Sequence, residues 1–196
     1  MPGNTRVIPR GEKFMNDKKV CDLTYTKLQI ESNWKQGEGH RYIYKEKINL
    51  SAWSRELGVS RQTLKTRLNY LKSAGLIREE KEVYILEPIG EHLIYIPEDT
   101  LRILTNAMKK DTIKIYAYLG GWFKYKQRNR QGYYTFTRYS LIGEIGLKRG
   151  NTTLQKVNDI LLILNKLGLV KTEEKEVVLN GSRTTQLVLL DWKEAL

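Results

Sequence analysis

Apolar residues recur with a helical period on both sides of a glycine in the first half of the chain. Leu50, Trp53 and Leu57 stand at i, i+3 and i+7, which places three side chains on one face of a short helix. Gly58 favours the left-handed turn that ends a helix, and Ser60 is a good N-cap for a second one. The pattern predicts two short helices joined by a sharp turn. The apolar stripe of the second helix consists of Leu64, Leu68 and Leu71.

The other face of this second helix is polar and basic, and no Asp or Glu occurs between residues 57 and 77. A helix-turn-helix presents the start of its second helix to the base edges of DNA, and Arg, Gln, Asn and Thr match the donors and acceptors there. The alternative is a basic face that is only solvated surface. The residues predicted to contact DNA are Ser60, Arg61, Gln62, Thr63, Lys65, Thr66, Asn69 and Lys72.

A hairpin is expected after the second helix. Gly75 ends that helix, apolar residues begin a strand at Leu76, and the segment 83–86 returns after a polar turn. Residues 50–86 therefore resemble the winged-helix family, in which a two-stranded wing follows the helix-turn-helix. We expect this first wing to stand off the DNA backbone, because carboxylates crowd its tip. These are Glu79, Glu80 and Glu82.

The chain contains an internal repeat. Four landmarks recur at an offset of 88 residues, and Gly75-Leu76-Ile77 recurs as Gly168-Leu169-Val170 at an offset of 93. The change of offset implies five extra residues in the second copy, at 148–152. A shared offset of this size indicates a repeated architecture. The landmarks are Ile8-Pro9 and Ile96-Pro97, Trp34 and Trp122, Ile48 and Phe136, and Leu57-Gly58 and Ile145-Gly146.

The repeat predicts an α+β, mainly helical fold made of two tandem winged helix-turn-helix domains related by internal duplication. The expected domains are residues 7–88 and 94–196, with a boundary at 87–90, where Pro and Gly lie close together. The other expected elements are helices over 23–34, 112–124, 139–145 and 152–167, and strands over 42–48 and 133–136.

The second copy offers its own DNA-contacting candidates. Arg128 and Arg130 are expected in an exposed basic loop that neutralises phosphates, with a merely solvated loop as the alternative. Asn180-Gly181 favours a tight hairpin turn, which puts Arg183 beside the tip of a second wing that touches DNA. Leu162 falls on the outer side of the second recognition helix, so we expect it to pack against the other domain or another subunit. The candidates in that helix and its approach are Lys148, Arg149, Asn151, Thr152, Thr153, Gln155 and Lys156.

Charge and composition narrow the class of partner. The formal net charge is +12 over 196 residues, which favours a polyanion, with nucleic acid ahead of an anionic membrane. No apolar run approaches the length of a membrane span, so no membrane partner is expected. One cysteine excludes an internal disulfide framework and fits a reducing cytoplasm. The two histidines lack a metal-ligand spacing and no P-loop ending is present, so we expect no catalysis, no metal and no cofactor.

Each predicted domain starts with an Ile-Pro and a helix that ends in aromatic residues, followed by a helix-turn-helix. In this pattern the chain resembles the initiator proteins of plasmid and phage replication. The resemblance implies binding of double-stranded DNA at a replication origin, recruitment of host replication proteins, regulation of transcription, and a homodimer or an oligomer formed on DNA. The chain has no obvious extra region for loading a helicase. The alternatives are a transcriptional repressor only, a DNA-binding adaptor in a plasmid segregation or conjugation complex, and an RNA-binding module.

Overall fold

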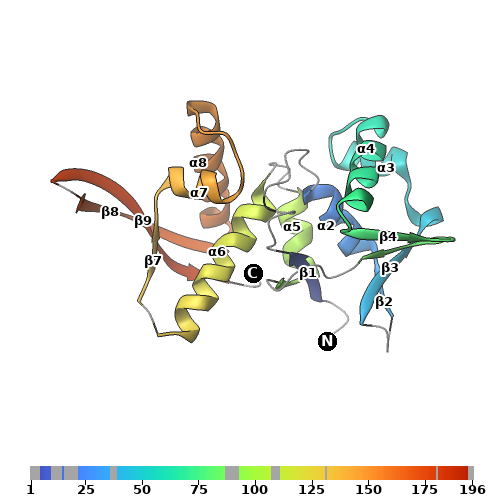
Figure 1. Cartoon of the computed structure of the whole chain (residues 1–196), viewed down its shortest axis with the longest axis horizontal. Coiled ribbons are helices and arrows are strands. Elements are labelled where there is room, and N and C mark those ends of the chain that lie inside the picture. The colour runs from blue at the N-terminus through green and yellow to red at the C-terminus, as the bar shows by residue number, and fades with distance from the viewer. Residues whose placement is uncertain are drawn as a thin grey trace. The chain divides into compact units, whose positions relative to one another are not determined.

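The computed structural model describes residues 5–9, 15, 22–35, 39–86, 93–106, 111–130, 132–179 and 181–193. The fold is α+β, and short antiparallel sheets accompany the helices (Figure 1). The chain divides into two compact units, residues 1–113 and 114–196, which we call unit 1 and unit 2. Each unit is described by itself below.

Unit 1 contains two sheets and four helices in its described part. The elements in chain order are β1 (Thr5–Pro9), α2 (Asp22–Glu31), β2 (Asn33–Lys35), β3 (His40–Tyr44), a 3-10 turn η1 (Lys45–Lys47), α3 (Leu50–Glu56), α4 (Arg61–Ser73), β4 (Ile77–Glu80), β5 (Val83–Leu86), β6 (Leu93–Pro97) and α5 (Glu98–Asn106). One sheet has the strand order β2-β3-β5-β4, and β1 pairs with β6 in the other.

Unit 2 is built around one long helix and one long hairpin. Its elements are α6 (Thr112–Arg128), which begins at the division between the units, β7 (Tyr134–Phe136), α7 (Arg138–Glu144), α8 (Asn151–Lys166), β8 (Val170–Leu179) and β9 (Ser182–Trp192). The strand order is β7-β9-β8. Both units have the order strand, helix, helix, hairpin. In each, the first strand pairs with the second strand of the hairpin, β3 with β5 in unit 1 and β7 with β9 in unit 2.

The strand β6 and the helix α5 belong to unit 1, whereas the sequence analysis assigned them to a domain over 94–196. β6 pairs antiparallel with β1, with Val7 opposite Tyr95, and α5 packs against α2. A strand pairing of this kind joins residues almost ninety positions apart, so no local pattern predicts it. The expected boundary at 87–90 lies outside the described residues.

The helix predicted over 23–34 is shorter than expected. It ends at Glu31, because the Ser32 hydroxyl donates a hydrogen bond to the Gln29 carbonyl (2.8 Å) and the chain then turns into β2, where Trp34 pairs with Arg41. Similarly, the strand predicted over 42–48 ends at Tyr44 and gives way to η1. The helix predicted over 112–124 is longer, because it continues to Arg128.

The core of unit 2 depends on a close contact between α6 and β9. The Trp192 indole stacks on Tyr116 with ring centroids 5.0 Å apart, and its Nε1–H donates to the Tyr116 carbonyl (3.1 Å). A Cβ placed on Gly120 would lie 2.4 Å from the Trp192 ring. Only glycine therefore fits at position 120, because any side chain there would prevent the close packing of α6 against the Trp192 ring.

Candidate nucleic-acid interface

The helix-turn-helix of unit 1 is formed by local capping at each end of the turn. Asn49 caps α3 by accepting hydrogen bonds from the backbone N–H groups of Ser51 (3.1 Å) and Ala52 (3.0 Å). Gly58 has φ +59, the left-handed conformation that the turn requires. Ser60 then caps α4 by accepting from the Thr63 N–H at 3.0 Å. The predicted pair of short helices is present with these signals.

The inner face of α4 is buried and its outer face is exposed. Leu64, Leu68 and Leu71 are buried, as predicted, and Arg67 is buried beside them. The inward position of Arg67 is not predictable from its charge, which favours an exposed position. The outer face is free of acidic residues. Its exposed members are Arg61, Gln62, Lys65, Thr66 and Asn69.

Not every predicted residue of this face is available to a ligand to the same degree. The Ser60 and Thr63 hydroxyls lie 2.8 Å apart within the cap, and the Thr66 hydroxyl donates to the Gln62 carbonyl (3.0 Å). These three side chains stabilise the helix. Within the described part of the chain, the remaining side chains of the face have no intramolecular hydrogen bond or ion pair. They are Arg61, Gln62, Lys65 and Asn69.

Lys72, also predicted to contact DNA, is bound to the first wing. Its ammonium group lies 2.8 Å from one carboxylate oxygen of Glu79, and the Lys45 ammonium lies 2.7 Å from the other. Hydrogen bonds from Lys45 and Lys72 lower the pKa of Glu79 to about 2, and the bond to Glu79 raises the pKa of Lys72. The contact of Lys45 with Glu79 is not predictable from sequence, because η1 precedes the helix pair and only folding brings Lys45 to the hairpin.

The carboxylates of the first wing are largely paired. Glu79 is held by two lysines, and Glu80 accepts a hydrogen bond from Arg78 on the same strand. Because cations neutralise Glu79 and Glu80, this hairpin repels DNA less than its sequence predicts. Lys81 at the tip is exposed and has φ +28.

In unit 2, α8 begins about one helical turn earlier, relative to the hairpin that follows it, than α4 does. Its N-cap is Gly150, which offers no side-chain cap, and the N-terminal residues of α8 and the preceding loop are exposed. Gln155 is exposed but donates a hydrogen bond to Asp159 (2.9 Å). Thr153 and Lys156 are half-buried. The exposed candidates at this end are Lys148, Arg149, Asn151 and Thr152.

The two helices are tied to their hairpins at corresponding positions. Lys72 of α4 contacts Glu79 of β4, and Asn165 of α8 contacts Thr172 of β8, so each bond joins residues seven apart and the two bonds lie 93 positions apart. Asn165 donates to the Thr172 hydroxyl (3.1 Å) and accepts from the Thr172 N–H (3.0 Å). With these contacts taken as equivalent, each residue of α4 corresponds to the residue of α8 that lies 93 positions later.

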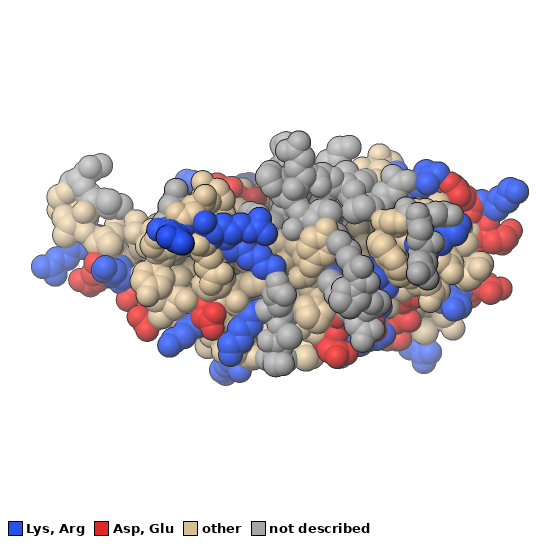
Figure 2. Space-filling view, turned by 90° about the horizontal axis from the view of Figure 1, so that it is seen from below, with Lys and Arg blue, Asp and Glu red and all other residues tan. Residues whose placement is uncertain are grey.

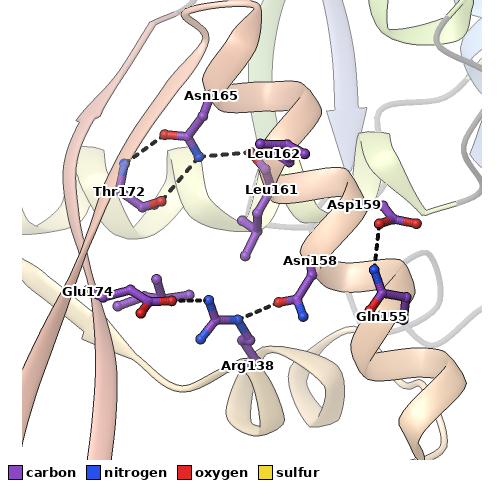
Figure 3. Close-up of a pocket in the computed structure, with 10 residues that line it drawn as sticks. Arg138, Gln155, Asn158, Asp159, Leu161, Leu162, Asn165, Thr172 and Glu174 are labelled. Carbon is purple, nitrogen blue, oxygen red and sulfur yellow. Dashed lines mark hydrogen bonds and ion pairs between the residues drawn. The ribbon is translucent and has the colours of Figure 1, made fainter.

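This alignment assigns an uncharged or acidic residue of α8 to every position of the basic face of α4. Leu162 occupies the place of Asn69 and is 55% exposed. The face borders a groove of about 390 Å³ between α8 and the hairpin, where Arg138 donates to Asn158 and pairs with Glu174 (Figure 3). The α8 residues that correspond to Arg61, Gln62, Lys65, Thr66 and Asn69 are Leu154, Gln155, Asn158, Asp159 and Leu162.

The second hairpin is a long β-ribbon with a two-residue turn. Leu179 pairs with Ser182, and Gly181 has φ +79, which fits the primed turn predicted at Asn180-Gly181, although Asn180 itself lies outside the described residues. Arg183 is exposed and stands opposite Val178.

Arg128 and Arg130 are exposed, but Arg128 is not in a loop. It is the last residue of α6, and backbone hydrogen bonds from Asn129 N to Tyr125 O (3.1 Å) and from Arg130 N to Gln127 O (3.2 Å) continue the turn to Arg130. Figure 2 views the molecule from below Figure 1. Lys and Arg side chains gather on this face of unit 2, the face on which α6 ends.

Comparison with protein-family models, with curated proteins and with solved structures finds no match to this chain. In the described ranges, each helix is too short or too polar to cross a membrane. The same ranges contain no cluster of three or more His, Cys, Asp or Glu side chains that could hold a metal ion. The function is therefore inferred from the chain's own surfaces.

Proposed function

We propose that the chain is a sequence-specific double-stranded DNA-binding protein of a mobile element, without catalysis of its own. The observation that carries the proposal is the outer face of α4. It is exposed, basic and free of acidic residues, it follows a capped helix-turn, and its Arg61, Gln62, Lys65 and Asn69 have no intramolecular partner in the described part of the chain. Such side chains match base edges in a major groove.

Two tandem winged helix-turn-helix domains that arose by duplication account for the shared architecture. The strand orders β3-β5-β4 and β7-β9-β8 correspond, α3 and α7 have the same length at an offset of 88, and both recognition helices are tied to their hairpins at matching positions. The pairing of β1 with β6 supports this proposal too. Val7 and Tyr95, opposite each other in the ladder, are also 88 apart, so equivalent strands pair symmetrically.

In this proposal α4 reads bases and unit 2 contributes mainly phosphate contacts. Lys148, Arg149 and Arg183 are exposed cations, and Asn151 and Thr152 present the open N-terminal turn of α8. Phosphate contacts of this kind supply affinity that falls steeply with salt. The biological role that we propose is initiation of replication at an origin, with regulation of transcription as a second role. The partners would be host replication proteins and further copies of the chain on DNA.

The test is a gel shift with the duplex DNA that flanks the gene for this protein, at two salt concentrations. Arg61→Ala should weaken binding to the specific duplex about 5- to 150-fold and leave binding to random duplex nearly unchanged, because a bidentate base contact is worth about 1 to 3 kcal/mol. Arg102→Ala removes an exposed arginine of α5 that pairs with Glu98, and is the control for an equal change of net charge. Unchanged specific binding by Arg61→Ala would contradict the assignment of α4 as the reading helix.

A second role, as a DNA-binding adaptor in a segregation or conjugation complex, is favoured by one observation. The outer face of α8 presents Leu162, 55% exposed, where α4 presents Asn69, and an apolar residue there suits a protein partner. Footprinting separates the roles. Iterated repeats beside an origin support an initiator, one short protected element supports a repressor, and protection that spreads with protein concentration supports the adaptor.

A further inference from the structure

A groove of about 450 Å³ lies at the C-terminal end of α6. It is lined by side chains of α6, of the turn that follows it, of β7 and of β9. In Figure 1 this end of α6 lies on the lower side of unit 2, while α7 and α8 lie on the upper side. The groove is therefore separate from the helix-turn-helix surface. Its principal lining residues are Phe123, Lys126, Arg130, Tyr133 and Tyr134.

Aromatic rings are exposed at the groove and braced from behind. Tyr133 is 68% exposed, and Tyr125 on the same end of α6 is 49% exposed. Behind Tyr133, the neighbouring Tyr134 is sandwiched between Trp122 (centroids 5.0 Å, planes 2° apart) and Phe136 (5.4 Å, 15°). The stack holds the first residue of β7 in place, so the exposed ring of Tyr133 is presented directly before a packed strand. An exposed aromatic ring lacks the favourable hydrophobic free energy that its burial would supply.

The charge around these rings has one sign. Lys126 and Arg130 line the groove, Arg128 is exposed one turn from Tyr125, and none of the described residues that line the groove is acidic. The sequence contains no Asp or Glu from Thr112 to Gly143. Figure 2 shows the corresponding gathering of cationic side chains on this face. A polyanion is therefore attracted to the groove, whereas an acidic lining would have repelled it.

We propose that this groove binds single-stranded nucleic acid, with a base stacked on Tyr133 and the flanking phosphates bound by Lys126, Arg128 and Arg130. A duplex keeps its base faces inside the stack, so an exposed ring beside cations suits unpaired bases, which offer both a π-face and a phosphate. This activity goes beyond duplex recognition by α4 and does not depend on it. It gives the chain one surface for a duplex and another for a strand that has been opened.

The test is fluorescence anisotropy with labelled 12-residue oligothymidylate and oligouridylate, and with a random duplex. Tyr133→Ala should weaken binding of the oligonucleotides roughly tenfold, and Tyr133→Phe should retain it, because stacking on an aromatic ring supplies affinity without a hydroxyl. Tyr139→Ala removes another exposed tyrosine, in α7, and is the control; Tyr139 is 46% exposed and Tyr133 is 68% exposed. Arg61→Ala should leave oligonucleotide binding unchanged, so failure of this inference is distinguishable from failure of the duplex proposal.

A second measurement identifies the contact without relying on an affinity change. An oligonucleotide that carries 5-iodouracil, irradiated in the complex, should crosslink to Tyr133. Equal binding of the two oligonucleotides supports readout of stacking and phosphate alone, and preference for one identifies DNA or RNA as the source of the strand. Wild-type binding by Tyr133→Ala, equal losses in Tyr133→Ala and Tyr139→Ala, or a crosslink only to other residues would overturn the proposal.

Discussion

The outer faces of α4 and α8 occupy the same place in two units with the same order of elements, yet their chemistry differs. α4 presents Arg61, Lys65 and amides, whereas α8 presents Leu154, Asp159 and Leu162 at the corresponding positions. The inner faces are alike, because the buried positions correspond and are mostly aliphatic. They are Leu64, Arg67, Leu68 and Leu71 in α4, and Val157, Ile160, Leu161 and Leu164 in α8. Under the proposed duplication, the scaffold keeps its core while its outer positions are free to specialise, and we propose that base reading is concentrated in α4.

The strongest way to test this difference is to give α4 the acid that α8 carries. Thr66→Asp places a carboxylate at the position that corresponds to Asp159, so binding of specific duplex should fall at least about a hundredfold, because like charges at an interface cost several kcal/mol. A gel shift measures it, with circular dichroism to check folding. Thr66→Ala removes the hydroxyl without adding charge and should lose less than about tenfold. Equal losses in the two variants would show that charge on this face is unimportant.

A matched pair of glutamines compares the two faces directly. Gln62 on α4 and Gln155 on α8 occupy corresponding positions and both are exposed, but Gln155 donates to Asp159. Gln62→Ala should cost about 1 to 3 kcal/mol of specific binding, whereas Gln155→Ala should cost less than about 0.5 kcal/mol. Isothermal titration with the specific duplex measures both. A larger effect of Gln155→Ala would place the reading helix in unit 2.

Local chemistry explains which parts of this surface were predictable from sequence. The turn at Gly58, the cap at Ser60 and the hairpin at Gly181 follow from backbone preferences within a few residues, and all three are present. The exposed position of Leu162 followed from helical periodicity, and its 55% exposure agrees.

Contacts between distant residues were not predictable in the same way. The sequence predicts that the carboxylate of Glu79 repels DNA, but Lys45 pairs with it. Lys45 lies 34 positions away and reaches Glu79 only because η1 folds against the hairpin. The assignment of β6 to unit 1 depends on its ladder with β1, which no periodicity reports. The sequence predicts Arg128 in a loop, but α6 continues to this residue. No glycine or proline interrupts the chain between Trp122 and Gly132, so nothing ends the helix earlier.

The contacts that tie each helix to its hairpin should differ in strength. The ladder shifts register between Lys171, which pairs with Asp191, and Thr172, which pairs with Leu189. Beside this irregularity, the half-buried Asn165 accepts from the Thr172 N–H (3.0 Å) and donates to the Leu161 carbonyl (2.8 Å). Asn165→Ala should therefore lower the free energy of unfolding by about 1 to 3 kcal/mol, because a backbone N–H loses its acceptor. Lys72→Ala breaks an exposed ion pair and should cost less than about 1 kcal/mol.

Thermal unfolding followed by circular dichroism measures both changes. Asn165→Asp keeps an acceptor for Thr172 but loses both donated bonds, so its midpoint should fall between those of wild type and Asn165→Ala. If Lys72→Ala lowered the midpoint more than Asn165→Ala did, the ion pair of unit 1 would be the stronger contact. Equal lowering would show that the two contacts do not differ in strength.

The smallest effect concerns pH, which should act on the contact in unit 1 alone. Hydrogen bonds from Lys45 and Lys72 lower the pKa of Glu79 to about 2, so the folded carboxylate binds its proton less readily than the unfolded one. Its contribution to stability is therefore present above the ordinary glutamate pKa and is lost as pH falls from that value through about 2. Asn165 and Thr172 do not ionise, so their contact should persist over this range. Carbon-13 NMR of the Glu79 carboxyl measures its titration, and a Glu79 midpoint at the ordinary value, or one unchanged in Lys72→Ala, would show that the lysines do not hold this carboxylate in solution.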